Sequence, residues 1–338
     1  MKGRLVALDH WEGREAAALM VDGRLEDLIV DPVGAPRLGT VIAVRVERPM
    51  KGQGGVIVSW EGGEAFLRRA KGLKPGARIL VQISGFAEPG KAPPASDRLL
   101  FKSRYAIVTP GAGGLNISRL VRDDDRRDAL KGLAVAAMEG TPEEMGLILR
   151  SAAASAEDDE ILEDIAAMRA ACAEALESTG DGLVLEGDGP HLAAWRDWTA
   201  PAQIETQDGS FAETGILEAI DSLFSPDVAL GPHCMTIEPT RALTAVDVDT
   251  GRDLSPAAAL KANMAAAKEL PRQLRLRGIG GQVTIDFAPL AKRDRRQIET
   301  TLRAAFRADS VETEVIGWTP LGHMELKRKR ERPALARG

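Results

Sequence analysis

The chain has 338 residues, of which 44% are hydrophobic and 28% are charged, a balance typical of a folded globular protein. No segment approaches the ~18 consecutive apolar residues of a membrane helix, and the first residues lack the apolar stretch of a secretion signal, so we expect a cytoplasmic protein without membrane contact. Cys172 and Cys234 are too few and too far apart for a disulfide framework or a local zinc site. Membrane and disulfide-rich secreted classes are therefore excluded.

The net charge of −6 is unevenly distributed along the chain. Residues 261–338 hold 17 lysines and arginines against 9 acidic residues, a local surplus of +8, so residues 1–260 carry −14. Eleven acidic residues lie between 151 and 190, where Arg169 is the single basic residue. We expect the basic C-terminal part, and not the acidic segment, to meet phosphate groups.

Short strands are predicted for the first hundred residues. Residues 3–31 are predicted to form an antiparallel meander with a hairpin turn at Asp22-Gly23. Prolines at 32 and 36 mark a boundary, and the evenly spaced strands over 39–83 favour a small barrel. Residues 87–97 have the composition of a loop.

Helical periodicity appears later in the chain. Apolar spacing predicts helices over 128–138 and 161–176, with Cys172 on the buried stripe of the second. Signals are weak from 191 to 235. Beyond them strands alternate with helices, which favours a layered α/β domain. These elements are expected at 243–248, 257–277, 283–287, 295–307 and 313–316.

Three carboxylates follow apolar strands in this last region. Asp247 and Asp249 end one predicted strand, and Asp286 ends another. Carboxylates at strand ends can converge at one edge of a sheet, and hard oxygen ligands of this kind bind magnesium. The alternative is that each aspartate only caps the turn or helix that follows it.

The wider context of these aspartates resembles the catalytic core of the ribonuclease E/G family. The family patterns T-E-A-L, I-D-V-N-[ST]-G, A-R-Q-L-R-L-R-x-x-G-G-I-I-I-D-F and L-G-L-x-x-M-[ST]-R-x-R occur in the same order here. The matching segments read TRAL at 240–243, AVDVDTG at 245–251, PRQLRLRGIGGQVTIDF at 271–287 and LGHMELKRKR at 321–330.

The resemblance is weaker upstream but covers most of the chain. Residues 113–119 (GGLNISR) and 146–152 (GLILRSA) are similar to the family's A-G-G-x-S-R-R and G-L-I-V-R-T-A segments. Residues 36–105 resemble its OB-fold RNA-binding insertion, with Phe66 at the base-stacking position. Residues 1–32 resemble its non-catalytic RNase H-like piece, in which Asp9 is expected to be a turn residue.

This resemblance implies an α+β multidomain chain, with a DNase I-like α/β catalytic domain, an inserted OB-fold RNA-binding β-barrel and an RNase H-like piece. The implied domains are RNase H-like N-terminal strands at 1–35, the barrel at 36–105, a 5′-sensor-like α/β region at 106–190, a reduced RNase H-like or linker segment at 191–230, and the catalytic domain at 231–338.

The resemblance further implies a magnesium-dependent endoribonuclease that cleaves single-stranded RNA by metal-activated attack of water, in RNA processing or decay. Asp247 and Asp286 would hold the Mg²⁺, which Mn²⁺ could replace. The implied RNA contacts are Phe66, Arg150, Ser151, Arg275, Arg277, Arg328 and Arg330. The four C-terminal arginines can equally form a solvated basic surface, and Phe66 can equally belong to the barrel core.

Several positions depart from the family pattern. Asp249 replaces an asparagine, and an ionised aspartate accepts hydrogen bonds but cannot donate them. Its carboxylate would therefore act on the metal or the attacking water. The alternative is that it only accepts backbone N–H groups in the turn at 250–251. Arg241 and Pro289 replace acidic residues, and Pro271 replaces an alanine inside the long helix.

The 5′-end sensing pair of the family is matched by Arg150 and Ser151. In the family this pair acts together with an arginine shortly after an Asp-Arg-x-Arg stretch, which here reads Asp-Ser-Val-Glu at 309–312. An acidic residue thus replaces an arginine that would bind a terminal phosphate. We therefore expect a weak or absent preference for RNA with a 5′-monophosphate.

The sequence stops before the position of the family's C-P-x-C zinc link, so we expect a short form without that link or a C-terminal scaffold. A homo-oligomer is compatible with this expectation, but a zinc-bridged one is not. Two other functions remain open: an RNA-binding or ribosome-associated protein with weakened or lost catalysis, and another phosphotransferase that uses the same carboxylates.

Overall fold

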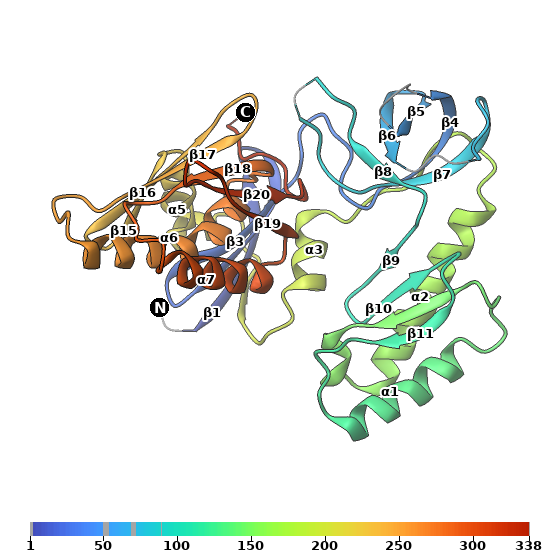
Figure 1. Cartoon of the computed structure of the whole chain (residues 1–338). Coiled ribbons are helices and arrows are strands. Elements are labelled where there is room, and N and C mark those ends of the chain that lie inside the picture. Colours follow the sequence, from blue (N-terminus) through green and yellow to red (C-terminus); the bar gives the residue numbers. More distant parts are fainter. Residues whose placement is uncertain (1–2, 50–53, 69–71, 89, 338) are drawn as a thin grey trace. The chain divides into compact units, whose positions relative to one another are not determined.

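The computed structural model describes residues 3–49, 54–68, 72–88 and 90–337 (Figure 1). The chain divides into two compact units, one formed by residues 1–31 together with residues 202–338, the other by Pro32–Pro201. The fold is a mixed α+β architecture, and the residues described here form four sheets. Within the described part of the chain, the helices are too short or too polar to span a bilayer.

The second unit begins with a β-barrel, as the sequence predicts. Its strands are β4 (Val41–Pro49), β5 (Gly55–Trp60), β6 (Gly63–Arg68), β7 (Arg78–Ile83) and β8 (Pro94–Ser96). They are ordered β4-β5-β6-β8-β7, and a β4–β7 pairing closes the five-stranded, OB-like barrel. Strand β8 lies in the segment 87–97, which the sequence predicted to be a loop. Its Pro94 is tolerated because it is the first residue of the strand, where no backbone N–H has to be donated to a neighbouring strand.

The rest of this unit is a small four-stranded sheet with helices. The strands β9 (Phe101–Lys102), β10 (Ala106–Thr109), β11 (Gly114–Ile117) and β12 (Gly146–Leu149) are ordered β11-β12-β10-β9. Helices α1 (Asp124–Ala137) and α2 (Asp158–Glu177) pack on them, and η1 (Ser151–Ala154), β13 (Gly182–Leu185) and α3 (Pro190–Asp197) complete the unit. Helix α1 starts four residues before the predicted position because Asp123 caps it. Cys172 is fully buried in this core, which confirms its predicted place.

The N-terminal meander of the first unit is confirmed. Strands β1 (Arg4–Trp11), β2 (Arg14–Val21) and β3 (Arg24–Val30) are antiparallel, and Asp22 and Gly23 have the positive φ values, 50° and 78°, that a tight hairpin turn of this kind requires. The distant β14 (Gln203–Glu205) adds a parallel strand to β1. Helices α4 (Ser210–Glu213) and α5 (Ile216–Ser222) bury their apolar residues against this sheet.

The second sheet of this unit carries the predicted carboxylates. Its six strands are ordered β15-β16-β17-β18-β20-β19. They are β15 (Asp227–Leu230), β16 (His233–Pro239), β17 (Thr244–Asp249), β18 (Gly281–Asp286), β19 (Thr313–Trp318) and β20 (Met324–Arg328). Strands β17 and β18 are parallel, and α6 (Pro256–Leu276) connects them; α7 (Arg295–Ala308) leads from β18 to β19. The sequence predicted these elements except β15, β16 and β20.

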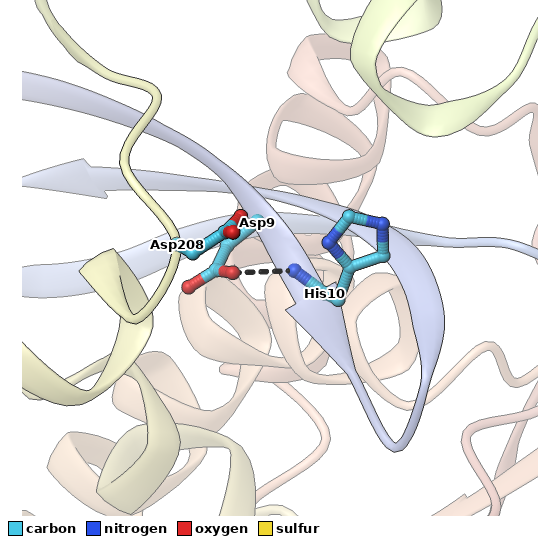
Figure 2. Close-up of side chains that lie close together, drawn as sticks. All are labelled: Asp9, His10 and Asp208. Carbon is cyan, nitrogen blue, oxygen red and sulfur yellow. Dashed lines mark hydrogen bonds between the residues drawn. The ribbon is translucent and has the colours of Figure 1, made fainter.

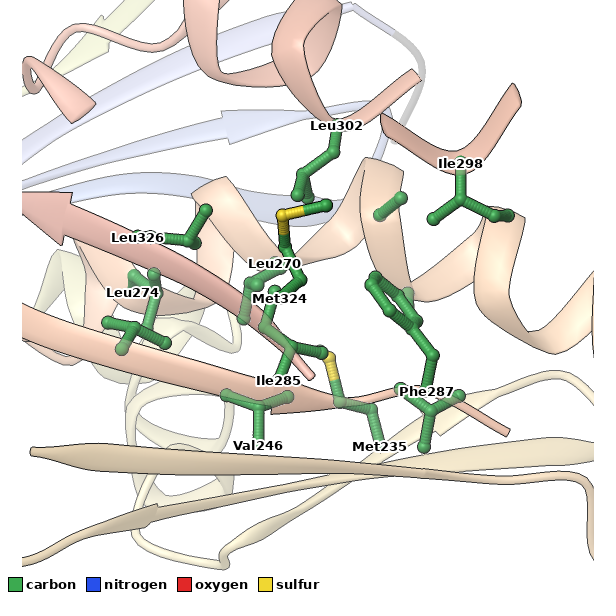
Figure 3. Close-up of a cluster of buried hydrophobic side chains, with 14 of the residues drawn as sticks. Met235, Val246, Leu270, Leu274, Ile285, Phe287, Ile298, Leu302, Met324 and Leu326 are labelled. Carbon is green, nitrogen blue, oxygen red and sulfur yellow. The ribbon is translucent and has the colours of Figure 1, made fainter. Parts of the chain in front are cut away.

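Helices α6 and α7 cover one face of this sheet. Ser255 caps α6 by accepting the N–H of Ala258 at 3.2 Å, and Pro271 lies within the helix, which continues to Leu276. Side chains from both helices meet apolar residues of the strands in one core (Figure 3). Because side chains alternate along a strand, the aspartates of β17 and β18 lie on the opposite, open face.

Candidate active site

Asp247 and Asp286 stand side by side at one edge of the open face. They are paired in register on the parallel strands β17 and β18, and both are exposed. The preceding Val246 and Ile285 point into the core, which fixes the two aspartates on the other face. The fold therefore brings together the two carboxylates that the sequence singled out.

The electrostatics of the pair favour a bound cation. Partial burial, then the charge of Asp286 and then that of Asp249, raise the pKa of Asp247 above its usual value. Adjacent carboxylates repel each other, and a cation between them removes that repulsion. Two exposed carboxylates on one face supply hard oxygen ligands without filling a coordination shell, which suits the largely hydrated Mg²⁺.

His323 is a neighbour of this pair that sequence reasoning missed. It lies in the turn between β19 and β20, and its Nε2 atom is 3.8 Å from Oδ1 of Asp286. In the sequence, His323 directly precedes the short alternating segment 324–328. Because this segment was not predicted to be a strand next to β18, His323 was not expected to lie near Asp286.

Asp249 lies on the same face, two residues after Asp247. Its Oδ1 atom accepts the N–H of Gly251 at 2.7 Å, and Gly251 has a positive φ of 71°. This is the turn contact that the sequence offered as one of its two roles. The charge of Asp249 also reaches Asp247, so a second role toward a metal or water stays a prediction.

Arg275 and Arg328 are buried among carboxylates. Arg275 is 8% exposed, and its guanidinium contacts Glu26, Asp27 and Asp309. Arg328 is 3% exposed and is 2.6 Å from Oδ2 of Asp309. Both groups hold the interior of this unit together and are not available to an RNA backbone, so we leave them out of the proposed site.

Arg277 and Arg330 are half-buried. Arg277 donates to the side chain of Gln273 at 3.1 Å and to the carbonyl of Ser225 at 2.7 Å. The guanidinium of Arg330 lies directly against the start of β18, where any side chain on Gly281 would collide with it. The consecutive glycines 280 and 281 at the start of β18 thus make room for Arg330. An RNA contact by either arginine stays a prediction.

Arg150 is already engaged by the protein. Its guanidinium donates to the carbonyls of residues 103, 104 and 196 and to the carboxylate of Asp197 at 2.7 Å. Lys102 also contacts Asp197, at 2.9 Å. Although burial alone would raise it, Arg196 and Lys102 hold the pKa of Asp197 well below its usual range. Ser151, next to Arg150, is exposed.

The acidic residues at 309–312 are engaged by basic residues of their own unit. The side chain of Asp309 is fully buried between Arg275 and Arg328, and Glu312 pairs with Lys329 at 2.5 Å. The expected repulsion of a terminal phosphate by this segment stays a prediction. Within the second unit, Asp197 is the carboxylate that contacts Arg150.

Phe66 lies on the outer surface of the barrel. Its neighbours Ala65 and Leu67 are fully buried in the barrel core, whereas Phe66 is half-buried, with its ring against Gly55. The alternative that Phe66 belongs to the barrel core is therefore wrong. Stacking on an RNA base stays a prediction.

A second group of potential metal ligands lies at the end of β1. Asp9, His10 and Asp208 bring ligand-type atoms within 4.8 Å of one another (Figure 2). The buried carboxylate of Asp9, however, accepts the N–H groups of His10 at 2.7 Å and Phe211 at 3.0 Å. These contacts lower its pKa against the effect of burial. We assign Asp9 a structural role in joining β1 to α4.

Comparison with known proteins agrees with this arrangement. Residues 101–202 and 192–331 match the sequence model of the Ribonuclease E/G family, so the chain belongs to that family. It is 26% identical to Ribonuclease E of Nostoc sp. over 382 aligned residues, which cover 95% of this chain and 55% of that protein.

Two further relatives show a similar level of identity. Ribonuclease E of Escherichia coli is 27% identical over 78% of this chain and 29% of its own length. Ribonuclease G of Salmonella typhimurium is 24% identical over 78% of this chain and 62% of its own length. The chain spans about half the length of the Nostoc relative and less than a third of the Escherichia coli one.

Proposed function

We propose that this protein is a magnesium-dependent endoribonuclease that cleaves single-stranded RNA, in RNA processing or decay. The observation that carries the proposal is the pairing in register of Asp247 and Asp286 at one sheet edge, in a chain of the ribonuclease E/G family. We assign the sheet that holds this pair to a DNase I-like catalytic domain and the N-terminal meander to an RNase H-like domain.

Asp247 and Asp286 would hold the Mg²⁺, or Mn²⁺ in its place. A divalent cation bound there supplies activation of water and neutralises the charge that develops on the phosphoryl oxygens. The chain itself places the two carboxylates side by side through the β17–β18 register, and Nε2 of His323 lies 3.8 Å from Oδ1 of Asp286. Phe66 would stack on a base of the bound strand.

A second candidate is an RNA-binding or ribosome-associated protein with weakened or lost catalysis. It is favoured by Asp249, whose carboxylate replaces the amide of the family pattern and is engaged by the N–H of Gly251. A third, a different phosphotransferase with the same acid pair, predicts nucleotide hydrolysis instead of RNA cleavage.

The test uses the full chain and a fluorescent single-stranded RNA with Mg²⁺ or Mn²⁺. We expect the wild type to cut it and D247N and D286N not to cut it. E314Q is the matched control, because Glu314 is an exposed carboxylate on the edge strand β19 of the same sheet. Cleavage by D247N or D286N at the wild-type rate would contradict the site, and binding without any cleavage by the wild type would favour the second candidate.

A further inference from the structure

Arg295 and Trp318 form a stacked pair next to the end of β18, the strand that ends in Asp286. Arg295 is the first residue of α7, and its Cζ atom is 4.8 Å from the centre of the Trp318 ring. That ring packs against Phe287, the residue directly after Asp286, at 5.7 Å. A Cβ atom on Gly322, the neighbour of His323, would lie 3.1 Å from Nη2 of Arg295. The pair thus lies next to residues adjacent in sequence to both Asp286 and His323.

Both members of this pair have a buried donor without an acceptor. The Nε of Arg295 and the Nε1 of Trp318 find no hydrogen-bond partner among the residues that the structure describes. Arg295 also has no ion pair within this described part, although Arg275 and Arg328 in the same unit both contact Asp309. Orphaned Nε atoms recur on other arginines of the described chain, but the N–H of Trp318 is the one buried indole donor there without a partner. Because buried donors are nearly always satisfied in folded proteins, this stacked pair indicates a missing acceptor.

The surrounding charge indicates that the acceptor is an anion. Four of the five residues at 292–296 are basic, and the first turn of α7 contains no acidic residue. Asp294 precedes α7 without a capping hydrogen bond from its side chain. Positive charge at the start of a helix opposes the helix dipole. Since this arrangement does not stabilise the helix, it fits a site for a negatively charged ligand.

We propose that Arg295, together with Trp318, binds a phosphate group of single-stranded RNA that passes the edge of the sheet at Asp286. This inference rests on the proposed function, because it takes RNA as the anion. A guanidinium can donate two parallel hydrogen bonds to a phosphate, and its planar group remains stacked on the indole while it does so. The indole N–H supplies a further donor.

The test measures binding of a fluorescent single-stranded RNA by anisotropy over a series of salt concentrations, in EDTA so that no cleavage occurs. R295M removes the charge but keeps a long unbranched side chain on the Trp318 ring. We expect R295M to weaken binding by about tenfold. The slope of log K against log salt should also fall in magnitude by about 0.7, the value for one lost phosphate contact on a single strand.

R307A is the matched control. Arg307 is exposed in the last turn of the same helix, roughly 18 Å along its axis from Arg295, and its loss changes the net charge equally. We expect R307A to bind RNA as the wild type does. Equal affinity and equal salt slope for R295M and R307A would overturn the inference.

Two more variants apply if R295M lowers the melting temperature. R295K keeps the charge and loses the planar fork, and W318F keeps an aromatic ring and loses the N–H donor. Both should bind RNA more weakly with little change in salt slope, whereas wild-type affinity in both would refute the inference. Failure of the proposed function is distinguishable: the wild type would not cut RNA with Mg²⁺, while R295M would still bind it more weakly than R307A.

Discussion

Asp249 carries a negative charge where the family pattern has asparagine. Its carboxylate serves the turn to Gly251, yet its charge helps to raise the pKa of Asp247. An asparagine keeps the acceptor oxygen for the turn and removes only the charge. Asp249 therefore offers a way to separate the structural role of this residue from its electrostatic role.

We predict that D249N lowers the affinity for Mn²⁺ and shifts its pH dependence. With Asp249 present, Asp247 takes up a proton at a higher pH than an ordinary aspartate, so metal binding weakens early as the pH falls. D249N should lower the pKa of Asp247 and move this loss to lower pH. Calorimetric titration with Mn²⁺ at several pH values measures both effects, and an unchanged affinity and pH profile would leave only the turn role.

Phe66 is half-buried and lies outside the barrel core. We predict that F66A weakens RNA binding by roughly 1–3 kcal/mol, the range for loss of one base–aromatic stack, with little change in melting temperature. L67A is the contrasting variant. Because Leu67 is fully buried, its truncation should lower the free energy of unfolding by about 2–5 kcal/mol. An F66A protein that melts early and binds RNA normally would refute the stacking role.

At the scale of elements, α3 places Asp197 against Arg150, which follows β12. A terminal phosphate of RNA would have to displace this carboxylate, which Arg196 and Lys102 also hold. We predict that RNA with a 5′-monophosphate and the same RNA with a 5′-hydroxyl are cut at similar rates. A large advantage of the monophosphate would contradict this explanation.

The matched variant for this prediction is D197N, which removes the negative charge and leaves the three cations. Its carboxamide attracts them less strongly, so a phosphate group could compete for Arg150. We expect D197N to gain a preference for the 5′-monophosphate, measured as the ratio of the two cleavage rates. D188N is a suitable control, because Asp188 pairs with Arg196 and has no ion pair with Arg150 among the described residues.

Local patterns predicted most elements but not the contacts between distant ones. The meander, the barrel, α6 and β17 each have a clear hydrophobic period or turn residues. Strand β20 reads Met-Glu-Leu-Lys-Arg, and its alternation is short and interrupted by charge. The acid pair was predictable because both aspartates end apolar strands. The pairing of Arg150 with Asp197 joins residues 47 positions apart, which no local pattern specifies.

At the scale of the molecule, Asp309 connects separate parts of the first unit. Its buried carboxylate contacts Arg275 of α6 and Arg328 of β20, and Arg275 also contacts Glu26 of the meander. Arg275 and Arg328, which the sequence assigns to a basic RNA surface, are therefore part of the interior. Loss of one partner in such a network leaves buried charge without compensation.

We predict that D309N lowers the free energy of unfolding by about 3–5 kcal/mol, because two buried guanidinium groups lose their common partner. D221N is the control, since the exposed Asp221–Arg337 pair should contribute about 1 kcal/mol or less. Urea denaturation at neutral pH measures both values. Equal stability of D309N and D221N would show that the network contributes little to folding.

The parallel pairing of β1 with β14 has a consequence for synthesis of the chain. The meander shares its core with Phe211, Ile216 and Leu276, all of which follow the inserted residues 32–201. At typical elongation rates the ribosome needs about 10–30 s to add those 170 residues. During that interval the second unit can fold, because its residues are contiguous in sequence. The apolar face of the meander stays uncovered until its packing residues are synthesised, and it can bind chaperones in the meantime.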